Sequence, residues 1–186
     1  MSTIGTVHVV FAFAAIAAGA LVLLLPKGTR WHRTVGHAYA TSMVGLIATA
    51  FAIYDLFGGF GPFHVAAVVS GATLLPGMGF ALLRRPRGRW MPRHAAWMVG
   101  SYIGLMCAFA AETTTRWIMP RVAPLLPEAL TWPVFWGAVV VASAGVGWLG
   151  GRLASRHLPR SLARTPAAMR AERAPATPDA PPRPAP

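Results

Sequence analysis

Five apolar stretches, each about as long as a membrane-spanning helix, account for most of this 186-residue sequence. A helix that crosses the hydrocarbon core of a bilayer, about 30 Å thick, needs roughly 20 predominantly apolar residues. Hydrophobic residues make up 55% of the chain and charged residues only 12%, whereas soluble domains carry about a quarter charged residues. We therefore predict an all-α integral membrane protein, with four transmembrane helices in a bundle of two hairpins and a fifth transmembrane helix beside it. The predicted spans are residues 7–25, 35–56, 63–83, 94–118 and 134–150.

Prolines and glycines mark the ends of these stretches. Pro26 and Gly28 end the first one, which we interpret as a span and not as a secretory signal, because no Lys or Arg precedes Lys27. Pro76 predicts a kink in the third stretch, because proline removes one helical hydrogen bond. Residues 120–133 are proline-rich and predict a connection that lies along the membrane interface, with three aromatic anchors, Trp117, Trp132 and Trp136.

The basic residues lie mostly on one side of the predicted spans. The net charge of +12 comes from residues between the apolar stretches and in the C-terminal tail, and not from a globular surface, so we predict no nucleic-acid partner. Fifteen of the seventeen basic residues fall on one side, and only Arg116 and Arg121 fall on the other. Because Lys and Arg are retained in the cytoplasm, we predict an external N-terminus and a cytoplasmic C-terminus.

We divide the chain into a five-span transmembrane domain, residues 1–150, and a basic cytoplasmic tail, residues 151–186. From about Pro166 onward Ala, Pro and Arg predominate, so this part is predicted to be disordered. Leucines are interspersed with arginines between Arg152 and Arg164, which suits binding to anionic lipid at about 1 kcal/mol per basic residue. A solvated tail that only orients the chain explains the same composition.

Five histidines at the ends of the predicted spans are the candidates for chemistry. His8 and His64 open the first and third spans on the outer side, whereas His32, His37 and His94 open the second and fourth spans on the inner side. The separation from His8 to His37 is 29 residues and that from His64 to His94 is 30. This spacing suits a duplicated helical hairpin, although so short a match also arises by chance.

Several motifs follow one another along the first four spans. They are Pro26-Lys27-Gly28-Thr29 with His32-Arg33 and Gly36, then Gly58-Gly59-Phe60 with Pro62 and His64, then His94 with Met98, Tyr102, Gly104 and Arg116. In this order they resemble the family of predicted membrane proteins called domain of unknown function 2306, over residues 7–116. His37 and the fifth span lie outside this pattern. The resemblance implies a multi-pass protein of the bacterial inner membrane with no established activity, and it singles out His8, His32, His64 and His94.

Pairs of histidines on facing helices suit the binding of haem b. Neutral imidazole is a common ligand of haem iron, copper and zinc. His8 with His64, and His94 with His32 or His37, would form two bis-histidine sites of a transmembrane electron carrier. Such a protein would be at most a membrane oxidoreductase, and the sequence does not identify its redox partner. These sites would lie near the membrane surfaces, where haem is less common, and the use of His37 moves the inner one about 7 Å deeper.

Two other functions account for the same residues. In a structural or accessory membrane protein without a cofactor, the histidines cap helices and contact lipid head groups. In a small-molecule transporter, Glu112, Arg116 and the histidines form a polar core. Glu112 and Arg116 are also spaced for a purely structural i, i+4 ion pair. No nucleophile with its base, paired carboxylates or phosphate-binding loop is visible, so hydrolysis and phosphoryl transfer have no apparatus.

Overall fold

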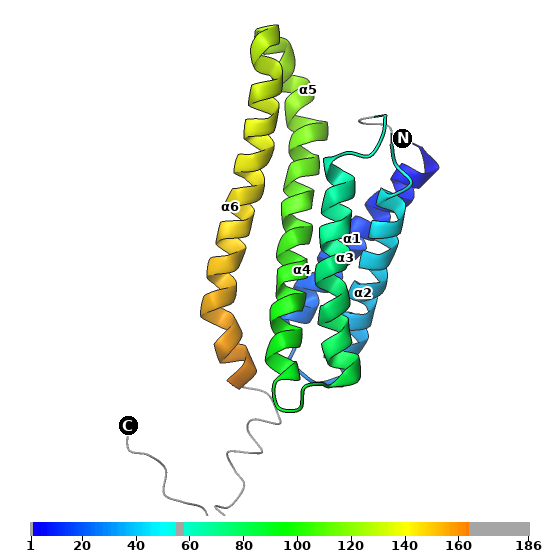
Figure 1. Cartoon of the computed structure of the whole chain (residues 1–186), viewed down its shortest axis with the longest axis vertical. Helices are drawn as coiled ribbons and strands as arrows, with labels where there is room; N and C mark the ends of the chain where they lie inside the picture. The colour runs from blue at the N-terminus through cyan, green and yellow to red at the C-terminus, as the bar shows by residue number, and fades with distance from the viewer. Residues whose placement is uncertain (1, 55–57, 164–186) are drawn as a thin grey trace, which may run out of the picture.

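The structure is a computed structural model that describes residues 2–54 and 58–163. The described chain is all-helical, as predicted, and its long helices run side by side (Figure 1). In order, the elements are α1 (Thr3–Leu24), α2 (Arg30–Ala50), α3 (Pro62–Leu83), α4 (Trp90–Thr113), the π-helical turn η1 (Thr114–Ile118), α5 (Met119–Val122), the 3-10 turn η2 (Ala123–Leu125) and α6 (Glu128–Ala163).

Local sequence signals set the first helix boundaries. Ser2 caps α1, because its hydroxyl oxygen accepts a hydrogen bond from the backbone N–H of Gly5 at 3.1 Å. Thr29 caps α2 in the same way through the N–H of His32 at 3.2 Å. Gly28 has a φ of +80°, a conformation that glycine adopts without steric cost, and it closes the tight turn between the two helices. Pro76 lies inside α3, which continues past it to Leu83.

Helix packing is concentrated in neighbouring pairs. α1 packs against α2, and α3 packs against α4, while contacts of α2 with α3 and of α1 with α4 bring the two pairs together. Their shared core is small and consists of six buried residues: Ala15, Tyr39, Ala40, Met43, Leu74 and Leu105. Further large apolar side chains remain exposed on the outside, including Val10, Leu75 and Val141. An apolar exterior around a small core is the arrangement expected of a bundle whose solvent is lipid.

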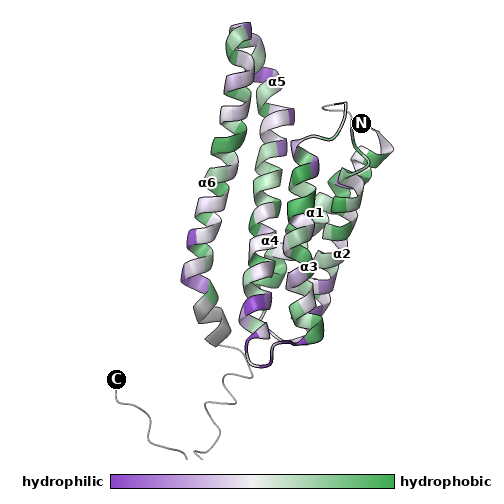
Figure 2. Ribbon diagram, viewed as in Figure 1, coloured by the Kyte–Doolittle hydropathy of each residue, from purple (hydrophilic) through white to green (hydrophobic). Residues whose placement is uncertain are grey.

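Four helical stretches of the described chain are long and apolar enough to cross a membrane. They are α1, α3, the stretch Trp90–Leu125 and Glu128–Leu158. α2 is not among them, because its polar residues, which include Arg30, Arg33 and His37, lower its hydropathy. Apolar residues dominate the helices in Figure 2.

The prediction that residues 120–133 form a proline-rich connection is wrong, because most of these residues are helical. The helical path that begins at Trp90 continues through η1, α5 and η2 to Leu125, and α6 begins at Glu128. Pro120 and Pro124 do not interrupt it, because each stands in the first turn of a short new helix, where a missing N–H costs no hydrogen bond. Residues 151–163, assigned to the tail from the sequence, are part of α6. The region from Pro166 onward lies outside the described residues.

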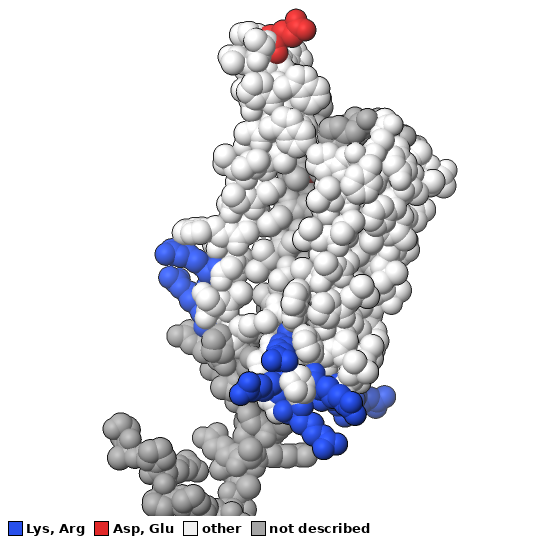
Figure 3. Space-filling model, viewed as in Figure 1, with Lys and Arg blue, Asp and Glu red and all other residues white. Residues whose placement is uncertain are grey.

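Basic side chains gather at one end of the molecule. Figure 3 shows Lys and Arg over the end of the bundle that carries the α1–α2 and α3–α4 connections, and over the adjoining part of α6. Lys27, in the first of these connections, donates hydrogen bonds to the carbonyl oxygens of Val22 at 3.0 Å and Leu23 at 2.7 Å. Partial burial lowers the pKa of its ammonium group. On the face that Figure 3 shows, the acidic side chains lie at the opposite end, where α6 begins.

Candidate functional site

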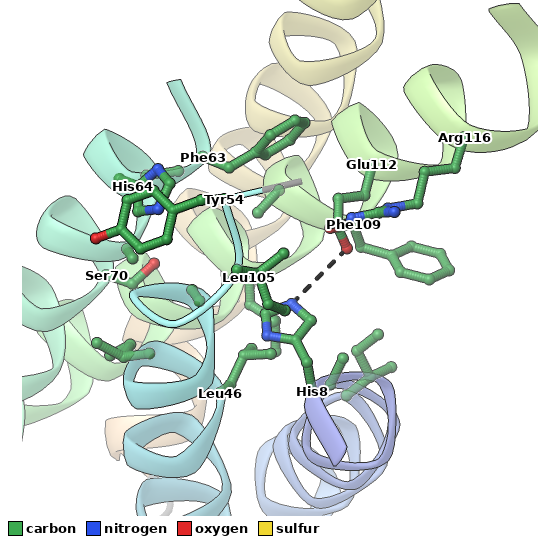
Figure 4. A pocket seen from close by; sticks show the side chains of 18 of the residues that line it. His8, Leu46, Tyr54, Phe63, His64, Ser70, Leu105, Phe109, Glu112 and Arg116 are labelled. Carbon is green, nitrogen blue, oxygen red and sulfur yellow. Dashed lines mark hydrogen bonds and ion pairs between the residues drawn. The ribbon is translucent and has the colours of Figure 1, made fainter. Parts of the chain in front are cut away.

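A pocket of about 90 Å³ lies between α1, α2, α3 and α4, at the end of the bundle opposite the basic connections. Its walls are mostly apolar, with a few polar side chains among them: His8, Tyr54, His64, Ser70, Glu112 and Arg116. Figure 4 shows His64 and Tyr54 on one side of this pocket and His8 with Glu112 on the other. The structure therefore brings together the two outer histidines and the Glu112–Arg116 pair.

His8 connects three helices through its two ring nitrogens. Its Nδ1 lies 3.0 Å from Oγ1 of Thr49 on α2. The Thr49 hydroxyl has one proton and lies 2.8 Å from the carbonyl oxygen of Gly45, so it donates there and accepts from Nδ1–H of His8. The other ring nitrogen, Nε2, lies 3.9 Å from Oε2 of Glu112 on α4, too far for a hydrogen bond. This contact is electrostatic and becomes an ion pair when the imidazole is protonated.

Glu112 also faces Arg116, one helical turn further along. Its Oε1 lies 3.4 Å from both Nε and Nη2 of Arg116. The side chain of Arg116 is 46% exposed, whereas that of Glu112 is 28% exposed and that of His8 is 13% exposed. A chain of three ionisable groups thus runs from the edge of the bundle to the pocket.

His64 stacks against two aromatic rings. It stacks on Tyr54, with ring centroids 4.7 Å apart, and on Phe60, with centroids 5.0 Å apart, and the residue is only 4% exposed. Its Nδ1 accepts a hydrogen bond from the backbone N–H of Gly61 at 3.0 Å. A neutral imidazole that accepts at Nδ1 carries its proton on Nε2, a tautomer assigned here from the hydrogen bond.

The Nε2 atom of His64 is buried and has no hydrogen-bond partner within the part of the chain that the structure describes. A buried donor without an acceptor costs about 1–3 kcal/mol, so such groups are rare in proteins unless they have a role. His64 is also one of the residues that line the pocket.

The inner histidines are arranged differently. His94 on α4 donates from Nδ1 to the carbonyl oxygen of Gly77 on α3, at 2.7 Å. His37 is exposed, and its Nδ1 lies 2.6 Å from the carbonyl oxygen of Arg33 on the same helix. The Nδ1 atom of His32 is buried without a partner among the described residues, and His94 and Lys27 are its electrostatic neighbours. His94 is thus joined to α3 and His37 to its own helix.

Several residues of the site were not singled out from the sequence. Thr49 and Tyr54 contact the two outer histidines but belong to no recognisable motif, whereas Phe60 stands in the Gly58-Gly59-Phe60 motif and was given no role there. The separation of 41 residues between His8 and Thr49 gives no local signal of their contact. Among the described residues, no three His, Cys, Asp or Glu side chains come close enough together to hold a metal ion.

The fold and the exposed apolar helices define a multi-pass helical membrane protein. The chain belongs to the family described as predicted membrane protein DUF2306, whose model matches residues 5–149. This confirms the family that the motifs indicated, but the match is longer than residues 7–116 and includes most of α6, so the fifth apolar stretch does not lie outside the family pattern. No curated protein and no solved structure matches the chain.

Proposed function

We propose that this protein crosses a bacterial inner membrane five times and binds a small molecule in the pocket between α1, α2, α3 and α4. The observation that carries the proposal is the buried Nε2–H donor of His64, a pocket-lining residue, which has no hydrogen-bond partner among the described residues. The ligand offers a hydrogen-bond acceptor to this donor and an apolar body to the alanine, leucine and isoleucine side chains of the walls. Glu112 and Arg116, with His8, form the polar edge of the same pocket.

The membrane topology is the second part of this proposal. α1 with α2 and α3 with α4 form two transmembrane hairpins, and α6 is the fifth span. α2 has 21 residues, about 31 Å in length, which is enough to cross the hydrocarbon core. The basic connections at one end support a cytoplasmic location for that end and an external location for the pocket.

Haem b fits the outer pair of histidines poorly. A cavity of about 90 Å³ is much smaller than the roughly 300–1,000 Å³ of pockets for drug-sized ligands, and a haem is larger than most drugs. Ligation through Nε2 of His64 also needs a lone pair there, whereas the hydrogen bond from Gly61 leaves the proton on Nε2. A visible spectrum of the purified protein before and after dithionite reduction tests haem binding at any of the five histidines.

The binding proposal is tested with a small carboxylate as the probe. We expect butyrate to raise the unfolding temperature of the protein in nanodiscs in a saturable manner, because its carboxylate accepts from Nε2–H of His64. His64→Phe keeps a ring between Tyr54 and Phe60 but removes the donor, so it should weaken butyrate binding at least about tenfold. His37→Phe is the matched control, because it removes a histidine that does not line the pocket.

His64→Phe also removes the nitrogen that accepts the hydrogen bond from the Gly61 N–H. A second variant therefore keeps the test decisive if the first one fails to fold. Ala12→Leu fills the pocket from α1 and leaves His64 unchanged, and it should abolish the butyrate effect. Equal butyrate binding by wild type and both folded pocket variants, or no binding by wild type, would contradict the proposal and favour a structural role without a ligand.

A further inference from the structure

A second cavity, of about 400 Å³, lies on the outside of the bundle between α3 and α6, with α4 as its floor. We call it the α3–α6 groove. α6 packs mainly against α4, which leaves space between α6 and α3. At Gly100 and Gly104, in the floor of the groove, an added Cβ atom would meet nothing within 4 Å.

Three hydroxyl groups that line the groove are already engaged within the protein. Thr73 donates to the carbonyl oxygen of Ser70, Thr115 to that of Ala111 and Ser143 to that of Cys107. Most of the remaining lining is apolar, including Val65, Val69 and Val139. An occupant therefore gains mainly by burying hydrocarbon.

The extent of the groove matches one leaflet of a bilayer. Its lining on α3 runs from Pro62 to Thr73, a rise of about 17 Å at 1.5 Å per residue. Half of a hydrocarbon core about 30 Å thick is about 15 Å. A transmembrane helix of another protein would pack along both leaflets, whereas one acyl chain of the outer leaflet needs only this length.

The groove and the pocket share a wall. Phe63, Ala66, Ser70 and Ala108, which lie along the seam between α3 and α4, line both of them. Three of the four side chains are small, so little side-chain volume separates the two cavities there. His64 lines the pocket and not the groove, so the two cavities lie on opposite sides of this seam.

We propose, building on the function proposed above, that the ligand is a long-chain carboxylic acid, with its carboxyl group in the pocket against His64 and its acyl chain crossing the seam into the groove. The pocket of about 90 Å³ is smaller than the roughly 150 Å³ cavity that holds one benzene ring, so it admits a carboxyl group but not a ring-shaped head group. The acid enters sideways from the outer leaflet and does not come from the aqueous phase.

Chain length provides the test. Unfolding temperatures of the protein in nanodiscs are measured with butyrate and with stearate, and we expect wild type to bind stearate at least tenfold more tightly, expressed per mole of lipid. Gly104→Leu fills the groove from its open floor and should reduce this ratio to about one. Gly79→Leu is the matched control, because Gly79 also has open space around its Cβ position but lies outside the groove, and it should keep the wild-type ratio.

The fluorescence of Trp136 reports the position of the chain directly. Trp136 lines the groove, so dibrominated stearate should quench a saturable fraction of the tryptophan fluorescence, and Trp136→Phe should remove that fraction. Gly100→Leu blocks the same floor if Gly104→Leu does not fold, and it should abolish the saturable quenching.

The outcomes separate the two proposals. If butyrate binds in a His64-dependent manner but stearate has no advantage, or if the floor variants keep that advantage, the groove inference is wrong and the pocket function stands. Equal saturable quenching by a dibrominated phospholipid would show ordinary annular lipid in the groove and overturn the inference. If neither acid binds, both proposals fail.

Discussion

The hydroxyl oxygen of Tyr39 on α2 lies 2.9 Å from Oγ of Ser101 on α4, and both residues are only 1% exposed. This hydrogen bond connects the α1–α2 pair to the α3–α4 pair at the centre of the bundle. Gly19 on α1 lies against the rings of Tyr39 and Tyr102 at the same level. The central layer therefore joins three helices.

Loss of the Tyr39–Ser101 hydrogen bond should destabilise the bundle modestly. In membrane proteins such bonds contribute about 0.6 kcal/mol on average and up to about 1.7 kcal/mol, because the unfolded helices find other partners in the membrane. We expect Tyr39→Phe and Ser101→Ala each to cost an amount in this range. A double-mutant cycle on the free energy of unfolding in mixed micelles should give a coupling energy of the same size. Fully additive losses would mean that the bond has no energetic effect.

A side chain at Gly19 should disturb the packing of α1. An added Cβ atom would clash with the ring of Tyr102, which lies against the buried Gly19. We expect Gly19→Ala to lower the free energy of unfolding by about 1–3 kcal/mol, the usual cost of overpacking. At Gly71 on α3 an added Cβ atom meets nothing within 4 Å, so Gly71→Ala should leave stability unchanged or raise it by up to about 1 kcal/mol. Equal effects of the two substitutions would refute the close approach of α1 to Tyr102.

The distribution of basic residues makes a prediction about topology. With fifteen basic residues on one side and two on the other, a reporter fused after Pro186 should be active in the cytoplasm and one fused before Met1 outside the membrane. Paired alkaline phosphatase and fluorescent protein fusions measure both ends. A periplasmic C-terminus would contradict five spans, and it would be expected if α2 did not cross the bilayer.

Truncation tests the part of the chain beyond α6. We expect a protein that ends at Pro166 to reach the membrane in the same amount and to unfold at the same temperature as the full chain, because the Ala-, Pro- and Arg-rich segment has few apolar side chains to bury. Removal of residues 151–186 should be more damaging, because it also deletes the last turns of α6. Loss of membrane expression after the shorter truncation would count against a disordered tail.

The sequence by itself determined the helical class, the approximate position of each long helix and the family. These follow from requirements that are local in the chain: each span needs about 20 apolar residues, and its backbone groups hydrogen-bond within the same segment. Glu112 and Arg116 were found from the sequence for the same reason, because their i, i+4 spacing lies on one helix. The helical path through residues 120–125 was missed, because proline in a first turn looks like a loop residue when only composition is considered.

Only the tertiary structure decided which faces of the helices meet. His8 finds Thr49 and Glu112, and His64 finds Tyr54 and Phe60, because each helix is rotated and spaced by its packing against the others. That packing depends on close approaches such as Met98 against Gly77 and Phe11 against Gly45, which no periodicity reveals. Hydropathy specifies that a helix lies in the bilayer. Because lipid offers the same apolar solvent to every face of that helix, hydropathy specifies the partner of a polar side chain much less well.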